Sequence, residues 1–329
     1  MMRKSSCLRL ARFVLLIGLS LALWQFSAAQ QSDLPKNVLQ VLKGHEETIY
    51  AVAVTPDGKY ILTASFDNTI RLWDSKTGKE IKTFGGDKGH KDLVLCLGLS
   101  PDGRTFASGS QDNSAKVWDV PGDTHLKAYT HGDEVNGLAL SNDGKLLAGA
   151  GKDGTVKLWN PADGKQLFNL TGHAGPVTGV SFSPDGKTLV SCGADQTLRV
   201  WNTADGKPLG SLYAHSGPAT GVRYSPNGTV LTIGEDGLLK YWKLPFAPSR
   251  NLAAPHADVV TSMFLNGDTL ITGSNDKTVR QWNFANGQLA RQSAPASAPL
   301  ADVALAPYNS LIAAGTADGN LVFWNPNDG

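Results

Sequence analysis

Seven tryptophans recur at nearly constant intervals along this chain, and an aspartate stands six residues before each of them. The tryptophans are Trp73, Trp118, Trp159, Trp201, Trp242, Trp282 and Trp324, at spacings of 45, 41, 42, 41, 40 and 42 residues. The aspartates are Asp67, Asp112, Asp153, Asp195, Asp236, Asp276 and Asp318. A histidine stands 26 to 28 residues before six of the tryptophans, at His45, His90, His131, His173, His215 and His256. A structural repeat of about forty residues is the length of one four-stranded blade.

Within each repeat the local signals are those of short strands joined by tight turns. Residues 70–73 (IRLW) and 198–201 (LRVW) alternate with a period of two, as half-buried strands do. Pro-Asp-Gly or Asn-Asp-Gly turns at residues 56–58, 101–103, 142–144 and 184–186 are typical of hairpins. Seven such units without amphipathic helices predict an all-β fold, a seven-bladed β-propeller of four-stranded antiparallel blades.

At the level of motifs, the repeats resemble WD repeats. The first contains Gly44-His45 and then residues 65–74 (SFDNTIRLWD), and the resemblance extends over residues 38–326. It implies a rigid propeller that serves as a platform for other molecules. Because the last repeat ends just after Trp324, it lacks a fourth strand. We expect residues 38–42 (VLQVL) to supply that strand and to close the ring.

The resemblance also implies a buried, hydrogen-bonded tetrad of histidine, serine or threonine, aspartate and tryptophan in each blade. The matching sets are His45/Thr63/Asp67/Trp73, His90/Ser108/Asp112/Trp118, His173/Ser191/Asp195/Trp201, His215/Thr232/Asp236/Trp242 and His256/Thr272/Asp276/Trp282. A buried aspartate needs donors, which imidazole, hydroxyl and indole groups supply. Since an active site is usually a single place, a set that recurs once per blade is interpreted as structural.

Two repeats depart from this pattern. Gly149 replaces the hydroxyl residue of the third repeat. In the seventh, Ala296 stands at the histidine position and Ala314 at the hydroxyl position, and the register between residues 290 and 300 is left open. The seventh blade is therefore expected to be the loosest.

Enzyme motifs are weak or missing in the sequence. Residues 149–154 (GAGKDG) match a dinucleotide pattern in letters alone, because they lead into a predicted strand instead of a helix. There is no C-x-x-C pair for a metal and no G-x-S-x-G nucleophile motif. The chain is interpreted as a non-catalytic interaction scaffold with no cofactor and no metal. The alternative is a propeller enzyme or small-ligand binder with a site at the mouth of the central channel.

The resemblance places partner contacts on one face, at the third and fifth residues after the histidine and at the residue before the aspartate. In the first two repeats these positions are Thr48, Tyr50, Phe66, Leu93, Leu95 and Gln111. Large apolar side chains gather there, which favours a protein-binding surface centred on Tyr50, Phe66, Leu93 and Leu95. The two leucines could instead pack within the blades. No block of like charge indicates nucleic-acid binding, and we expect a monomeric propeller with protein partners.

The first 29 residues have the pattern of a secretory signal peptide. Four basic residues precede the apolar run 13–26, and small residues follow it up to Ala29. Residues 30–37 are then a short linker and residues 38–326 the propeller. This pattern predicts a secreted or periplasmic protein without a membrane span after cleavage. An uncleaved membrane anchor is the alternative, although fourteen apolar residues are short for a span.

Overall fold

The computed structural model describes residues 38–326 except 121, 123–124, 244–246, 252–255, 285 and 307–310. The chain divides into two units, Met1–Lys36 and Asn37–Gly329, and every described residue belongs to the second. The predicted signal peptide (residues 1–29) and linker (residues 30–37) lie outside the described residues.

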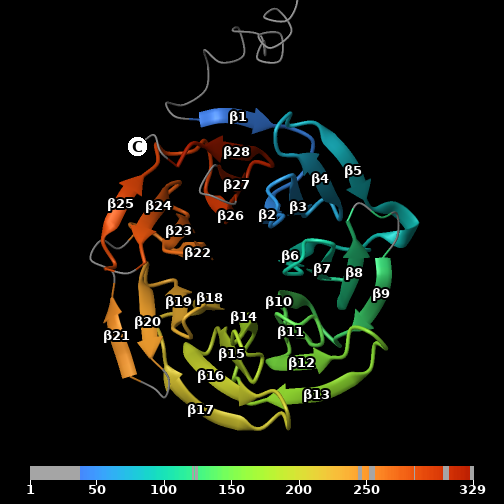
Figure 1. The fold of residues 1–329 in the computed structure, drawn as a ribbon, viewed down its shortest axis with the longest axis vertical. Coiled ribbons are helices and arrows are strands. Elements are labelled where there is room, and N and C mark those ends of the chain that lie inside the picture. Colours follow the sequence, from blue (N-terminus) through green and yellow to red (C-terminus); the bar gives the residue numbers. More distant parts are fainter. Residues whose placement is uncertain are drawn as a thin grey trace, which may run out of the picture. The chain divides into compact units, whose positions relative to one another are not determined.

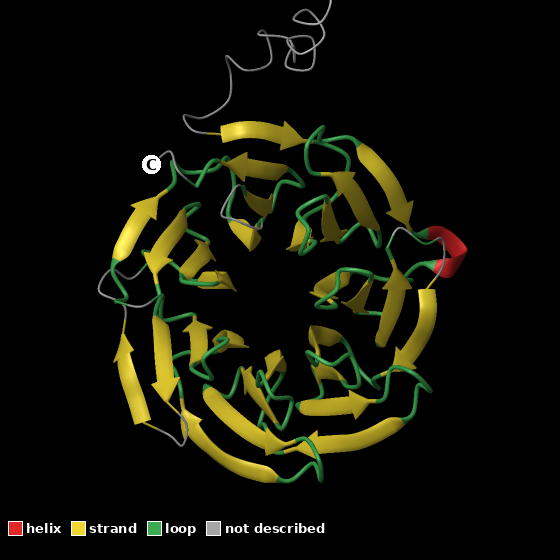
Figure 2. Ribbon diagram, in the orientation of Figure 1, coloured by secondary structure: helices red, strands yellow, loops and turns green. Residues whose placement is uncertain are grey.

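Seven four-stranded antiparallel sheets stand around a central axis as the blades of a propeller (Figure 1). This confirms the predicted all-β, seven-bladed fold. In each blade the strands follow one another outward from the channel, so that β2, β6, β10, β14, β18, β22 and β26 surround the centre. Among the described residues the helical structure is one short 3-10 turn, η1 (Gly86–Lys88), on the outer rim (Figure 2).

The blades follow the sequence repeats. Blade 1 consists of β2 (Ile49–Val54), β3 (Tyr60–Ser65), β4 (Ile70–Asp74) and β5 (Glu80–Phe84). Blade 2 consists of β6 (Val94–Leu99), β7 (Thr105–Ser110), β8 (Ser114–Asp119) and β9 (His125–Thr130). Blade 3 consists of β10 (Val135–Leu140), β11 (Leu147–Gly151), β12 (Thr155–Trp159) and β13 (Gln166–Thr171). Blade 4 consists of β14 (Val177–Phe182), β15 (Thr188–Gly193), β16 (Thr197–Asn202) and β17 (Pro208–Tyr213).

The remaining blades have the same order. Blade 5 consists of β18 (Ala219–Tyr224), β19 (Val230–Gly234), β20 (Leu239–Lys243) and β21 (Ala247–Asn251). Blade 6 consists of β22 (Val260–Asn266), β23 (Thr269–Ser274), β24 (Val279–Asn283) and β25 (Leu289–Gln292). Blade 7 consists of β26 (Leu300–Leu305), β27 (Ile312–Thr316), β28 (Leu321–Trp324) and the first strand of the chain, β1 (Val38–Leu42).

The ring is closed by the strand that the sequence predicted. β1 pairs antiparallel with β28, with Leu42 opposite Leu321 and Val41 opposite Val322. β1 and β28 lie side by side in Figure 1, although they are the first and last strands of the chain. The pairing covers the edge of β28, which would otherwise be open to strand addition.

The hydrophobic core lies between neighbouring blades. At the seam, Ile49 and Ile61 of blade 1 pack in one cluster with Ala313, Leu321 and Phe323 of blade 7. Similar clusters lie between blades 1 and 2, 2 and 3, 3 and 4, 4 and 5, and 5 and 6. Burying a large apolar side chain contributes about 1.5–3 kcal/mol. An isolated blade would expose these side chains, so the ring is stable as a whole.

The turn after each repeat aspartate has the same backbone conformation in all seven blades. The residue that follows the aspartate has φ between 63° and 77°, at Asn68, Asn113, Gly154, Gln196, Gly237, Lys277 and Gly319. Glycine and asparagine tolerate this left-handed region, whereas glutamine and lysine are uncommon there. In five blades the turn brings the aspartate carboxylate within hydrogen-bond distance of the histidine of the same repeat.

Candidate functional site

In five blades the histidine, hydroxyl residue, aspartate and tryptophan form one chain of hydrogen bonds. The indole Nε1–H donates to the hydroxyl oxygen at 2.7–3.0 Å, as between Trp201 and Ser191. The hydroxyl oxygen lies 2.7–2.8 Å from the imidazole Nε2, and the imidazole Nδ1 lies 2.7–3.0 Å from the aspartate. Since the hydroxyl accepts from the indole, its own hydrogen points to Nε2, and the Nδ1–H of a neutral histidine donates to the carboxylate.

The pKa directions agree with a neutral histidine beside a charged aspartate. Burial lowers the pKa of His173, His215 and His256, against the raising effect of their aspartates. For Asp276, burial would raise the pKa, but hydrogen bonds from Thr278 and His256 outweigh it and bring the value to about 2. The same opposition holds the pKa of Asp67 and Asp112 well below the ordinary range.

These sets contain the residue types of a catalytic triad, but their hydroxyl groups are not accessible to a substrate. The hydroxyl residues Thr63, Ser108, Ser191, Thr232 and Thr272 are all fully buried, with 0% of their surface exposed. A nucleophile has to reach a substrate atom, and here the hydroxyl is enclosed by its own indole and imidazole. The arrangement can hold the turn in place and cannot attack a substrate.

Blade 3 differs because Gly149 supplies no hydroxyl. The Nε2–H of His131 instead donates to the carbonyl of Gly149 at 3.2 Å. With its proton on Nε2, the neutral imidazole has none on Nδ1. The Nδ1 atom lies 3.7 Å from the Asp153 carboxylate and has no hydrogen-bond partner. Loss of one hydroxyl thus uncouples the histidine from the aspartate.

Blade 7 keeps its aspartate and tryptophan with different neighbours. Ser297 donates to Asp318 at 2.8 Å, 21 residues away in sequence, and so takes the place of the histidine. Sequence reasoning missed Ser297, although its separation from the aspartate is close to the histidine spacing. The indole Nε1 of Trp324 is buried and has no partner among the described residues.

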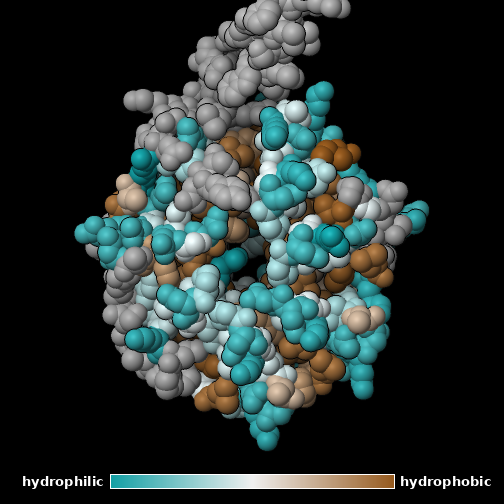
Figure 3. Space-filling view, viewed as in Figure 1, coloured by the Kyte–Doolittle hydropathy of each residue, from teal (hydrophilic) through white to brown (hydrophobic). Residues whose placement is uncertain are grey.

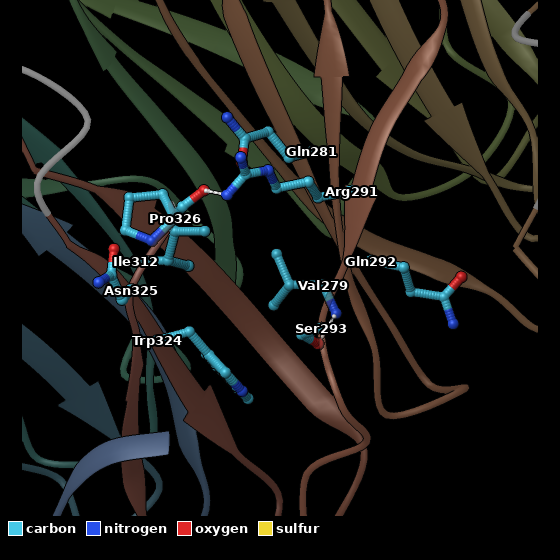
Figure 4. Close-up of a pocket in the computed structure, with 9 residues that line it drawn as sticks. All are labelled: Val279, Gln281, Arg291, Gln292, Ser293, Ile312, Trp324, Asn325 and Pro326. Carbon is cyan, nitrogen blue, oxygen red and sulfur yellow. Dashed lines mark hydrogen bonds between the residues drawn. The ribbon is translucent and has the colours of Figure 1, made fainter. Parts of the chain in front are cut away.

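A cavity of about 20 Å³ lies beside this tryptophan. Figure 4 shows Trp324 and Val279 on its walls, and Arg291, which donates to the carbonyl of Pro326 at 3.0 Å. A space of this size holds about one water molecule, so it is no substrate pocket.

The predicted partner surface lies where the repeat loops meet the inner strands. Phe66 donates its backbone N–H to the carbonyl of Thr48 at 3.0 Å, and Gln111 does the same to Leu93 at 2.9 Å. Tyr50 stacks on Phe66, with ring centroids 5.0 Å apart and planes at 20°, and 45% of Tyr50 is exposed.

The other four predicted residues differ in how free their side chains are. Leu93 and Leu95 are half-buried. The Thr48 hydroxyl donates to the carbonyl of Ala317 in blade 7, and the Gln111 amide donates to Glu134 in blade 3. The structure therefore gives Thr48 and Gln111 partners in neighbouring blades.

A second repeated contact, which sequence reasoning missed, ties the inner strands together. The second residue of each inner strand is a β-bulge. In blades 3 to 6 its side chain donates to a backbone carbonyl of the next blade at 2.6–3.1 Å, from Asn136, Thr178, Thr220 and Thr261. The sequence did carry a signal for this contact, because a hydroxyl or amide residue stands five positions after each of four successive histidines. Tyr50 and Leu95 hold this position in blades 1 and 2, where Leu95 has no hydrogen to donate.

Three further observations concern other kinds of site. Cys96 and Cys192 are free and buried, and burial raises the pKa of each thiol to about 12. Across the described residues, His, Cys, Asp and Glu form no group of three that could hold a metal ion. Nor does any helix in the described ranges have the length and apolar character needed to cross a membrane.

Comparison with known proteins identifies the repeats. The model of the WD domain, G-beta repeat, matches residues 36–74, 78–119, 124–160, 164–202, 206–243 and 248–283. The chain is 54% identical over 43 residues to ribosome assembly protein 4 of Saccharomyces cerevisiae, covering 13% of this chain and 8% of the relative. It is 32% identical over 99 residues to mitochondrial division protein 1 of Pyricularia oryzae, covering 22% of this chain and 15% of that protein. It is also 36% identical over 63 residues to small ribosomal subunit protein RACK1 of Candida albicans, covering 18% of this chain and 19% of that protein. The matches thus span less than a fifth of each relative.

These relatives contradict the predicted location. Ribosome assembly, the small ribosomal subunit and mitochondrial division belong to the interior of cells. The expectation of a secreted or periplasmic protein, with a membrane-anchored alternative, is therefore wrong. It rested on a local basic, apolar and small-residue pattern in residues 1–29, whereas the relatives match through the repeats themselves.

Proposed function

This chain belongs to the WD domain, G-beta repeat family, and on that premise we propose that it is a non-catalytic platform for protein–protein interaction. We further propose that its partner surface is centred on Tyr50, Phe66, Leu93 and Leu95, with Thr48 and Gln111 at the edge. The tetrads serve the framework in this proposal, and the chain uses no cofactor or metal. The partner is a protein and not a nucleic acid, and it binds a single propeller.

The stacked pair of Tyr50 and Phe66 is the observation that carries the proposal. Its rings lie 5.0 Å apart, and 45% of Tyr50 remains exposed. Aromatic side chains that are fixed before binding give up little conformational entropy, which is why tyrosine is frequent at interface hot spots.

Rigidity of the surrounding backbone supports the same conclusion. Phe66 and Thr48 are tied together by a backbone hydrogen bond, as are Gln111 and Leu93. The side chains of Thr48 and Gln111 reach blades 7 and 3, so the edge of the surface is held in place. A prearranged apolar centre with a polar edge suits a partner that presents an apolar side chain.

The test is an affinity capture from an extract of the source organism with the full chain as bait. The Tyr50→Ala/Leu93→Asp variant is compared with a matched control, Tyr213→Ala/Leu209→Asp. Tyr213 and Leu209 are 79% and 53% exposed and lie on β17 of blade 4. Before the capture, both variants are checked to have the same melting temperature as the wild-type chain.

The proposal expects proteins that are retained by the wild-type chain and by the control but lost with the Tyr50/Leu93 variant. Each captured protein is then purified and titrated against the three baits. Equal binding to all three would show that this surface is not the binding site.

A further inference from the structure

Two charged side chains and one phenylalanine interrupt a wall of small residues around the central channel. The third residue of the inner strand is small in six blades, at Ala51, Cys96, Gly137, Gly179, Gly221 and Ser262, and is Asp302 in blade 7. The fifth residue is Ala53, Gly98, Ala139, Ser181 and Ala304 in five blades, and Phe264 and Arg223 in the other two. The inner wall is thus uncharged at these positions except for one acid and one base.

Both charges face one cavity. A space of about 170 Å³ is lined by inner-strand residues that include Arg223, Ser262, Met263, Asp302, Thr178 and Cys96. The space-filling view shows the opening at the centre of the ring (Figure 3). Arg223 is exposed to this space and Asp302 is partly exposed, although seven strands surround them.

The Asp302 carboxylate is held by backbone groups and keeps capacity for a further donor. Its Oδ2 accepts from the N–H of Val52 at 2.7 Å, across the seam between blades 7 and 1, and its Oδ1 accepts from Val303 at 2.9 Å. A carboxylate has about four acceptor positions, so two remain. Burial raises the pKa of Asp302 to about 6, against these hydrogen bonds and the charge of Arg223.

The Arg223 guanidinium is not satisfied by the described residues. It lies over the ring of Phe264, 5.3 Å from the centroid, and none of its nitrogens has a hydrogen bond or an ion pair within 4.0 Å in the described part of the chain. Burial lowers the pKa of Arg223 and the charge of Asp302 acts in the opposite direction, yet the two groups do not form a salt bridge. Between their blades lies Ser262, 8% exposed, whose Oγ has no hydrogen-bond partner at normal distance and is close enough to affect Asp302.

We propose that this cavity binds a small zwitterion of the amino-acid class, its carboxylate on Arg223 and its ammonium group on Asp302. A simple anion would be repelled by Asp302 and a simple cation by Arg223, whereas a molecule with both charges satisfies both. The cavity is smaller than the roughly 300–1,000 Å³ of pockets for drug-sized molecules, which limits the ligand to a few heavy atoms. This proposal does not require a protein partner on blades 1 and 2, although the two sites are neighbours: burial raises the pKa of Tyr50, and the charge of Asp302 adds to that effect.

The test uses the full chain and probes of defined charge. Binding of glycine, L-alanine, β-alanine and γ-aminobutyrate is measured by saturation-transfer NMR and calorimetric titration. N-acetyl-L-alanine lacks the ammonium charge and L-alaninamide lacks the carboxylate, so they are single-charge counterparts of L-alanine. The variant is Arg223→Met, and Arg104→Met is the matched control because Arg104 is exposed outside the cavity lining.

At least one zwitterion should bind the wild-type chain more tightly than either single-charge probe. Arg223→Met should weaken that binding about 10- to 100-fold, as expected for loss of a hydrogen-bonded charge, and Arg104→Met should leave it unchanged. Asp302→Asn is informative only if it unfolds as the wild type does, because Asp302 also bonds Val52. The inference is overturned if no zwitterion binds better than both single-charge probes, or if Arg223→Met binds the zwitterion as well as the wild type does.

Discussion

Replacing Ser191 with alanine removes a single oxygen atom from the centre of blade 4. That oxygen is fully buried, accepts from the indole of Trp201 at 2.8 Å and lies 2.7 Å from Nε2 of His173. The change leaves both partners buried without a bond, at about 1–3 kcal/mol for each unsatisfied group. We therefore expect the free energy of unfolding to fall by about 2–6 kcal/mol in total.

Blade 3 indicates how far the structure can relax after such a loss. There the histidine turns its proton to a backbone carbonyl and loses the short contact with its aspartate, which lies 3.7 Å away. The same adjustment at His173 would recover one hydrogen bond and sacrifice another. A value nearer the lower end of the range is therefore expected, with the unfolding temperature reduced by about 4–10 °C.

The assay is urea unfolding followed by tryptophan fluorescence, with a thermal melt as the second measurement. Ser211→Ala removes the same atom from an exposed position on β17 of the same blade, and it should change stability by less than about 0.5 kcal/mol. If Ser191→Ala matched Ser211→Ala in both measurements, the tetrad would not stabilise the blade and the reasoning would fail.

Three further predictions follow from the same contacts. Deleting residues 37–42 removes β1 and exposes the edge of β28, so we expect a lower melting temperature and aggregation on size-exclusion chromatography; an unchanged melt would contradict closure by β1. Gly149→Ser restores a hydroxyl residue at this position but should not stabilise blade 3, because the added Cβ would lie 2.8 Å from the Trp159 ring. A clear rise in the urea midpoint of this variant would refute the prediction. Stability should fall as the pH drops below about 6.5, since the unfolded histidines then take up protons that the buried ones, such as His256, resist. Four histidines have a lowered pKa and contribute to this loss of stability, whereas the raised pKa of Asp302 acts in the opposite direction. Below about pH 4 the aspartates add a second loss of stability, because aspartates of the unfolded chain are protonated at a higher pH than Asp276 in the folded chain. Urea midpoints that stay constant from pH 8 to pH 5 would contradict the histidine contribution.

The repeat spacing by itself determined the fold, the number of blades and the strand that closes the ring. The reason is physical: each forty-residue unit has one buried tryptophan and apolar side chains on its strands, and such a unit buries both faces only beside another like it. The departures at Gly149, Ala296 and Ala314 were also visible as missing side-chain groups.

Tertiary structure alone decided which side chains meet across blades. Asn136 reaches the carbonyl of Val177, and Thr178 reaches the carbonyl of Ala219, in each case 41 residues away; both contacts depend on how neighbouring sheets are placed. The separation of Arg223 and Asp302 around one cavity depends on the same placement, because they come from blades 5 and 7 and are far apart in sequence. Periodicity along one blade specifies that blade's hydrogen bonds, but the angle and distance between blades follow from the packing of all seven around the axis.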